Sequence, residues 1–142
     1  MTRRVMMLGL AVVLCRATMA VAQPQWTPEK WTEVETLNLC TTGPTEGVYC
    51  FAVWMVVVDG DVYVRLGNKA ADRVKANTSG MVMPVEISGQ RFERVRMTEA
   101  PDAVDRVNDA MADKYTSDIF IRFFSHPLTL RLKPEGSTTT SS

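Results

Sequence analysis

Histidine and cysteine are scarce in this chain of 142 residues. It has one histidine, His126, and three cysteines, of which only Cys40 and Cys50 lie beyond the apolar N-terminal segment. These three residues fall short of the four nitrogen and sulfur ligands of a structural zinc site. No serine, cysteine or carboxylate can be assigned as a catalytic partner of His126, and the proline that follows it indicates a turn. We therefore expect His126 to be structural or exposed, with a general base as the alternative.

The chain also lacks an excess of charge and a long apolar run. Its 16 basic and 16 acidic residues balance, and charges of one sign are not grouped, so a nucleic-acid-binding surface is not expected. Four aspartates of residues 102–113 follow a helical spacing and indicate a solvated face. The longest apolar run near the N-terminus covers residues 5–14, which is too short to span a bilayer.

The N-terminus has the pattern of a secretory signal peptide. Arg3 and Arg4 precede the apolar run, and Ala20-Val21-Ala22 provides the small residues of a cleavage site. We expect cleavage after Ala22, with an uncleaved anchor as the alternative, and no membrane association after cleavage. The leader holds three of the basic residues and none of the acidic ones, so the mature chain has a net charge of about −3. This predicts an exported protein, periplasmic or secreted.

The mature chain retains two cysteines, Cys40 and Cys50. An even pair in an exported protein predicts a disulfide, which would stabilise the fold by about 2.5–3 kcal/mol. A metal site or a redox dithiol is the alternative, but the pair is not a C-x-x-C motif. No metal site is expected.

The mature chain is organised around residues 53–66. Two runs rich in valine and aromatic residues flank Asp59-Gly60, a sequence typical of a two-residue hairpin turn. In that register Val58 faces Asp61 and Trp54 faces Arg65. One face is wholly apolar and belongs to the core, whereas the other is mixed and is the candidate functional surface: Trp54, Val56, Val58, Asp61, Tyr63 and Arg65.

Other segments predict the remaining elements. A strand is expected at 32–39, a loop at 41–47, a short helix at 68–77 with Asn68 as its N-cap, and a longer helix at 101–115. A second hairpin turns at Ser88-Gly89, with a bulge near Glu93-Arg94, and Pro84 indicates that its own strand lies at a sheet edge or is bulged locally. A strand or packed loop is expected at 119–124, and a last strand at 128–132.

The expected order is strand, hairpin, short helix, hairpin, longer helix and strand. It predicts an α+β protein, a small antiparallel split β-barrel with two helices, in one domain over residues 23–134. The leader covers residues 1–22, and the Ser/Thr-rich residues 135–142 are expected to be a disordered tail. Asn77-Thr78-Ser79 fits the N-glycosylation pattern, which matters only in a eukaryotic source.

Three short segments resemble the domain of unknown function family 2255. They are Trp54-Met55-Val56-Val57 leading to Tyr63-Val64-Arg65, then Lys114-Tyr115, and then Leu130-Arg131-Leu132. That family is grouped with the pyridoxamine-phosphate-oxidase-like split barrels, many of which bind FMN at a homodimer interface. The sequence departs from the family pattern at Thr116, where a glycine is usual. The resemblance implies a split barrel and makes FMN a candidate cofactor.

The resemblance also implies an anion site at the end of the third strand. Arg65, Asn68 and Lys69, with Arg73 or Lys75 one turn on, match the basic residues that hold the FMN phosphate in such barrels, and free N–H groups at a helix start suit an anion. Two plainer interpretations remain open, a solvated surface or a cation–π contact of Arg65 with Trp54. A C-terminal histidine ligates haem in some split barrels, which adds haem ligation as an alternative for His126.

The sequence assigns no catalytic residue and leaves open whether the protein is an enzyme. We expect an exported split-barrel protein that binds a small ligand, in particular a small anion, or a partner. The candidate ligand residues are Trp54, Tyr63, Arg65, Asn68 and Lys69. A homodimer is expected because the mixed face is too apolar to remain exposed. The alternative is an FMN-dependent oxidoreductase. Trp26 and Trp31 are expected to pack over a barrel end or at an interface.

Overall fold

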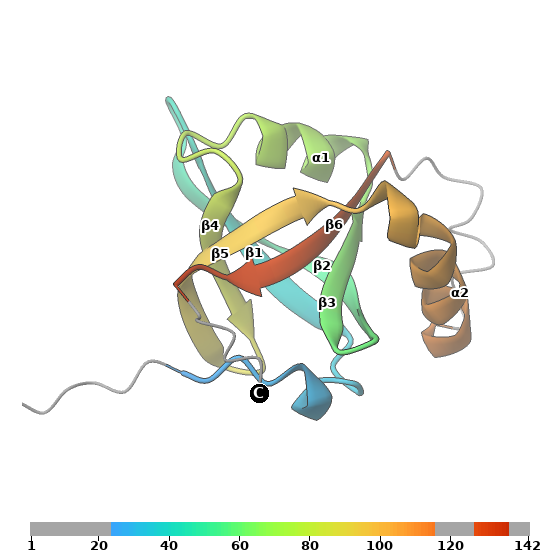
Figure 1. Cartoon of the computed structure of the whole chain (residues 1–142). Helices are drawn as coiled ribbons and strands as arrows, with labels where there is room; N and C mark the ends of the chain where they lie inside the picture. The colour runs from blue at the N-terminus through green and yellow to red at the C-terminus, as the bar shows by residue number, and fades with distance from the viewer. Residues whose placement is uncertain (1–23, 116–126, 137–142) are drawn as a thin grey trace, which may run out of the picture.

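The fold is a six-stranded antiparallel β-barrel with two helices (Figure 1). The computed structural model describes residues 24–115 and 127–136. Its elements follow the expected order: η1 (Pro28–Lys30), β1 (Thr36–Gly43), β2 (Gly47–Val58), β3 (Asp61–Leu66), α1 (Asn68–Lys75), β4 (Val82–Ile87), β5 (Gln90–Glu99), η2 (Pro101–Ala103), α2 (Val104–Lys114) and β6 (Leu128–Pro134). The strands run in the order β1-β2-β3-β6-β5-β4, and β4 pairs with β1 to close the barrel. The predicted fold class is confirmed.

The β2–β3 hairpin has the predicted register. Val58 pairs with Asp61 and Met55 pairs with Val64, around a turn in which Asp59 and Gly60 both have positive φ, at 51° and 79°. Such angles match the right-handed twist of the flanking strands, which explains the Asp-Gly sequence. The paired region ends at Met55–Val64, so the predicted pairing of Trp54 with Arg65 is not part of it. The two strands part at this point.

The β4–β5 hairpin contains the predicted bulge. Met83 pairs with Val95 and Val85 with Phe92, so Glu93 and Arg94 together oppose the single residue Pro84. Proline cannot donate a ladder hydrogen bond, and the extra residue on β5 accommodates it.

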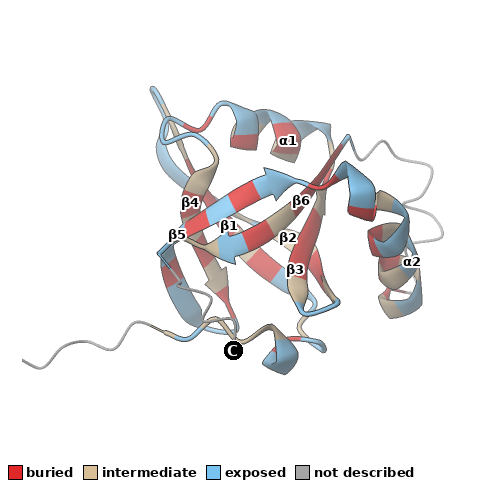
Figure 2. Cartoon of the chain, in the orientation of Figure 1, coloured by how far each residue is buried: buried red, intermediate tan, exposed pale blue. Residues whose placement is uncertain are grey.

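The apolar residues form two separate cores. The larger one fills the barrel, and Figure 2 shows its buried residues along the strands. Trp26 and Trp31 pack edge to face with Phe92, so the lead-in covers a barrel end as expected. Ala71 and Val74 of α1 join the same core. The second core lies outside the barrel, between α2 and the β2–β3 hairpin.

Several predicted boundaries need correction. The first strand covers 36–43 rather than 32–39. The reason is that β1 and β2 remain paired beyond Cys40 and Cys50, up to the tight turn between Gly43 and Gly47. Gly67, with extended backbone, precedes α1, and Asn68 is already its first helical residue. Glu135 was expected in the tail, but its carboxylate forms ion pairs with Arg94 and Arg96 of β5. The segments 1–22 and 119–124, together with His126, lie outside the described residues.

Asn77 has a structural role in the described fold. Its side chain is nearly buried, with Oδ1 accepting from the Thr42 N–H at 2.8 Å and Nδ2 donating to the Gly80 carbonyl at 2.7 Å. These bonds join the end of α1 to β1 and to the turn that precedes β4. The amide nitrogen that a glycan would occupy is therefore already engaged.

Candidate functional site

Helix α2 covers much of the mixed face of the hairpin. Val56 and Tyr63 are buried, at 4% and 1% exposure, against an apolar stripe of the helix that includes Val107 and Met111. The apolar stripe of an amphipathic helix is stable when it packs against another apolar surface, and Val56 and Tyr63 of the mixed face provide that surface. The chain itself thus buries the patch on which the expectation of a dimer rested.

The end of α2 is fastened to the barrel by two polar side chains. Lys114 Nζ donates to the carbonyl oxygens of Val34 and Met55, the latter at 3.2 Å. The Tyr115 hydroxyl lies within hydrogen-bonding distance of the carbonyl oxygens of Glu35 and Met55. We call Lys114 and Tyr115 the α2 clasp.

Burial perturbs both groups of the clasp. It raises the pKa of the Tyr115 hydroxyl to about 12, because the phenolate would lose its hydration. It lowers the pKa of Lys114, an effect that the carboxylates of Glu33 and Glu35 oppose. Since both side chains are occupied by backbone carbonyls, the clasp has a structural role and no evident catalytic one.

A pocket opens where β2 and β3 part. Its volume is about 200 Å³, and it lies at the junction of both strands with α1 and α2. Its lining residues are Val53, Trp54, Arg65, Leu66, Gly67, Ala70 and Met111. We call it the split pocket. The structure thus brings together two of the predicted ligand residues, Trp54 and Arg65, around a mainly apolar space.

Trp54 and Arg65, the lining residues of the split pocket whose side chains can donate hydrogen bonds, are both held in place. The Trp54 ring stacks on Tyr115, with ring centroids 4.7 Å apart and planes 6° apart. Arg65 donates from a terminal guanidinium nitrogen to Asn108 Oδ1 of α2 at 3.0 Å. Both residues are half-buried. A fixed aromatic surface beside a fixed cation suits a flat ligand with an anionic group.

The other predicted ligand residues do not line this pocket. Tyr63 is buried under α2, and its hydroxyl accepts from Arg131 Nε at 3.0 Å. Asn68 is exposed in the first turn of α1. Lys69 lines a different groove, between α1 and the β1–β2 turn, together with Arg73. There Arg73 pairs with Glu46 at 3.0 Å and lies over the Tyr49 ring, so the groove has no concentration of positive charge.

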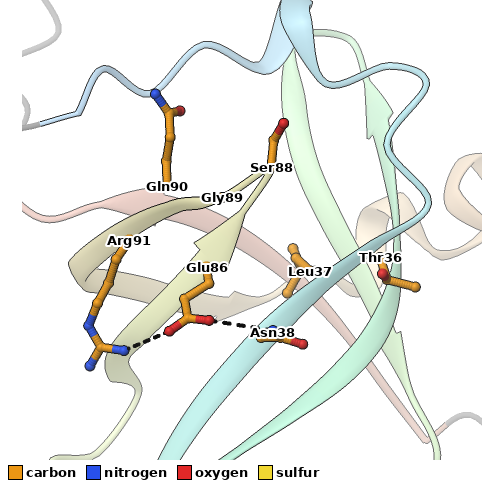
Figure 3. Close-up of a pocket in the computed structure, with 8 residues that line it drawn as sticks. All are labelled: Thr36, Leu37, Asn38, Glu86, Ser88, Gly89, Gln90 and Arg91. Atoms are coloured by element: carbon orange, nitrogen blue, oxygen red, sulfur yellow. Dashed lines mark hydrogen bonds and ion pairs between the residues drawn. The ribbon is translucent and has the colours of Figure 1, made fainter.

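A third hollow lies where β1 meets the β4–β5 turn, and Figure 3 shows its lining residues. Glu86 accepts from Asn38 at 3.4 Å and from Arg91 at 2.9 Å, so the polar groups that converge here are bonded to one another. This hollow therefore offers a ligand fewer available hydrogen-bonding groups, and we regard the split pocket as the better candidate site.

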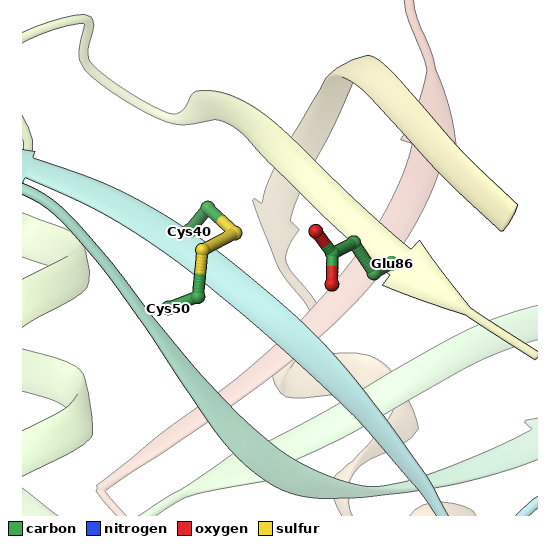
Figure 4. A group of neighbouring side chains, drawn as sticks. All are labelled: Cys40, Cys50 and Glu86. Carbon is green, nitrogen blue, oxygen red and sulfur yellow. A yellow bond between two sulfur atoms is a disulfide. The ribbon is translucent and has the colours of Figure 1, made fainter. Parts of the chain in front are cut away.

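Cys40 and Cys50 form the predicted disulfide between β1 and β2 (Figure 4). Glu86 lies beside them, and the three side chains would otherwise resemble a set of metal ligands. A disulfide sulfur is no thiolate, so the oxidised pair cannot ligate a metal as thiolates do. The covalent bond fits an oxidising compartment. No helix in the described part of the chain is long and apolar enough to cross a membrane.

Sequence analysis missed the contribution of α2 to the site. Asn108 orients Arg65, Met111 lines the pocket and Tyr115 supports Trp54. Val107, Met111 and Tyr115 follow one another at a helical spacing of four in the sequence, and the mixed hairpin face was the apolar surface left to receive them. Matching these two surfaces would have predicted the docking.

Comparison with known proteins supports the fold alone. The solved structure of conserved hypothetical protein Rv2991 from Mycobacterium tuberculosis resembles this chain with a TM-score of 0.56. The match has 17% sequence identity and covers 80% of this chain and 86% of the other. No protein-family model matches the chain, and the comparison with curated proteins found no match.

Proposed function

We propose that this protein is a small-ligand-binding barrel that takes a flat, anionic molecule in the split pocket. The observation that carries the proposal is the meeting of Trp54 and Arg65 around one largely apolar hollow. Trp54 would stack on the ring of the ligand, and Arg65 would donate hydrogen bonds to its anionic group. The described residues that line this pocket include no general acid, base or nucleophile, and binding is what we propose.

Pocket size favours a ligand smaller than a flavin. Ligand sites usually enclose about 300–1,000 Å³, and the split pocket encloses about 200 Å³. A single aromatic ring with a phosphate or carboxylate suits this space. FMN would extend out of it and would need further contacts.

Flavin-dependent oxidation is the second candidate, and it rests on the resemblance to the flavin-binding split barrels together with the barrel fold. Arg65 would then hold the phosphate. The isoalloxazine ring would need a second surface, which a partner subunit could supply. We also propose that the protein is exported, since the disulfide suits an oxidising compartment and the N-terminal sequence has the pattern of a leader.

Ligand titration tests the proposal. Pyridoxine 5′-phosphate serves as the small probe and FMN as the large one, with binding followed by calorimetry. Removing one charge-assisted hydrogen bond costs about 1.5–3 kcal/mol, so Arg65→Gln should weaken binding about ten- to a hundred-fold. Arg106→Gln is the matched control, because Arg106 lies on the exposed side of α2 and pairs with Asp59.

The outcomes separate the two candidates. Binding of the small probe that Arg65→Gln weakens and Arg106→Gln leaves unchanged would support the ligand-binding function. A yellow protein with absorbance near ~450 nm, or FMN binding at micromolar concentration, would favour the flavin function. No binding of either probe at millimolar concentration would contradict both.

A further inference from the structure

The first half of β2 has an edge to which no strand of the described chain is paired. β2 pairs with β1 along Gly47–Trp54, but it pairs with β3 only along Met55–Val58. The barrel closes through the β1–β4 pair and through the β2–β3 pair at Met55–Val58. Neither pair uses this edge of the first part of β2. Figure 1 shows the β1–β2 hairpin extending beyond the barrel end that α1 covers.

The register tells which backbone groups point toward the open edge. The Cα atoms of Cys40 and Cys50 are 4.0 Å apart, the short separation of a pair without mutual backbone hydrogen bonds. Met55, by contrast, donates its N–H to the Glu35 carbonyl on the β1 side. The even-numbered residues of β2 therefore direct their N–H and C=O groups away from β1. Along the open edge these residues are Val48, Cys50 and Ala52.

The strand at this edge carries no charged residue and no proline of its own. Proteins commonly block exposed edges with charged residues or proline, and residues 48–58 contain neither. Val48 and Tyr49 are 65% and 47% exposed, and Cys50 and Ala52 are exposed as well. Such an edge is suited to main-chain pairing with another strand.

We infer that this edge pairs with the same edge of a second copy of the chain, antiparallel and centred on Cys50. A two-fold axis there would place Val48 opposite the partner's Ala52, and all three even-numbered residues would exchange their backbone hydrogen bonds. Tyr49 would lie opposite the partner's Phe51, which forms a cross-strand aromatic pair.

The sequence of the edge favours a second copy over an unrelated peptide. The segment is its own complement in this register, because small side chains meet on one face and aromatic ones on the other. Tyr49 and Phe51 already stack within the chain, with ring centroids 6.0 Å apart, and Arg73 lies over the Tyr49 ring, so both aromatic side chains are held in place before pairing. The disulfide fixes β2 to β1 at the centre of the edge, which keeps the strand extended without a partner. The pairing does not depend on ligand binding in the split pocket.

Hydrogen exchange at low and high protein concentration tests this pairing residue by residue. Amides of Tyr49 and Phe51 point toward β1 and should exchange slowly at every concentration. Those of Val48, Cys50 and Ala52 should exchange rapidly in dilute protein and roughly tenfold or more slowly in concentrated protein, where the dimer forms. Light scattering on the same samples should show the mass rising from one chain to two.

Charged residues on the edge provide the second arm of the test. The double variant Val48→Lys/Ala52→Lys should remain monomeric, because it places like charges next to the pairing surface. Gln90→Lys adds a charge at an exposed position of β5 and should dimerise like the unmodified chain. A mass of one chain at all concentrations would overturn the inference. Dimerisation unaffected by the double variant would do the same, as would even-numbered amides that are protected already in the monomer.

Discussion

The rings of Trp54 and Tyr115 lie parallel, 4.7 Å apart, and join the split pocket to the end of α2. Trp54 comes from β2, just beyond the residues that pair with β3, and Tyr115 directly follows the helix. One face of the Trp54 ring is therefore occupied within the chain. The Tyr115 ring is in turn positioned by its hydroxyl group, which lies within hydrogen-bonding distance of the carbonyl oxygens of Glu35, just before β1, and of Met55 in β2.

Tyr115→Phe should destabilise the fold while keeping the ring stack. The loss of the hydroxyl removes a hydrogen bond from buried carbonyl oxygens, and such a loss costs about 1–2 kcal/mol. Urea unfolding should show a lower midpoint with an unchanged slope. Tyr115→Ala, which also removes the ring, should cost about 3–5 kcal/mol. Equal stability of the Phe variant and the unmodified chain would show that the Tyr115 hydroxyl does not contribute to the stability of the fold.

The same hydroxyl predicts a loss of stability in alkali. The folded pKa of Tyr115, about 12, lies above its ordinary value of 10.0. Its contribution is therefore fully present below pH 10 and is lost as the pH rises toward 12. Lys114 has a lowered pKa, so it acts in the opposite direction, and stability from that residue rises as it loses its proton. The difference in unfolding free energy between the unmodified chain and Tyr115→Phe isolates the tyrosine. It should shrink between pH 10 and 12, and a constant difference would contradict the argument.

Removal of the disulfide should lower stability without changing the fold. The loop between Cys40 and Cys50 spans ten residues, so the chain-entropy estimate is about 2.5–3 kcal/mol for Cys40→Ala/Cys50→Ala. Chemical unfolding with and without reductant measures this loss in the unmodified chain, and the double variant should not respond to reductant. Alkylation of exported protein without reductant should label neither cysteine. Two labelled thiols would refute the disulfide.

Asn77→Ala should lower the stability of the fold more than a substitution just after a short helix usually does. It would leave the Thr42 N–H and the Gly80 carbonyl without their partner, at a cost of about 1–3 kcal/mol. Thr78→Ala, which removes the glycosylation pattern but keeps Asn77, serves as the control. Thermal unfolding that is lowered equally by the two substitutions would contradict a role for the Asn77 amide.

Much of the barrel was predictable because local rules determine it. Turn chemistry at Asp59-Gly60 fixed the β2–β3 register, and the change of apolar phase between Phe92 and Val95 indicated the bulge on β5. The length of the first strand was not predictable, because the disulfide and pairing with β2 extend it through residues that favour turns.

The site was only half predictable. Alternation along the hairpin placed Trp54 and Arg65 on one face, and the structure brings both to the same pocket. Alternation also added Tyr63, which α2 buries, and the resemblance added Lys69, which lies in another groove. Which helix covers which face depends on contacts between residues about 50 positions apart, and periodicity within one segment cannot supply them.

The most direct test of the proposed function is the response of the three tryptophan indole N–H signals in a ¹⁵N NMR titration with pyridoxine 5′-phosphate. Trp54 lines the split pocket, whereas Trp26 and Trp31 pack at a barrel end with Phe92 and act as internal controls. We predict that the Trp54 signal shifts and saturates, that Arg65→Gln weakens this response about ten- to a hundred-fold, and that the other two signals stay in place. An unmoved Trp54 signal at millimolar ligand, or shifts confined to Lys69 and Arg73, would contradict ligand binding in the split pocket.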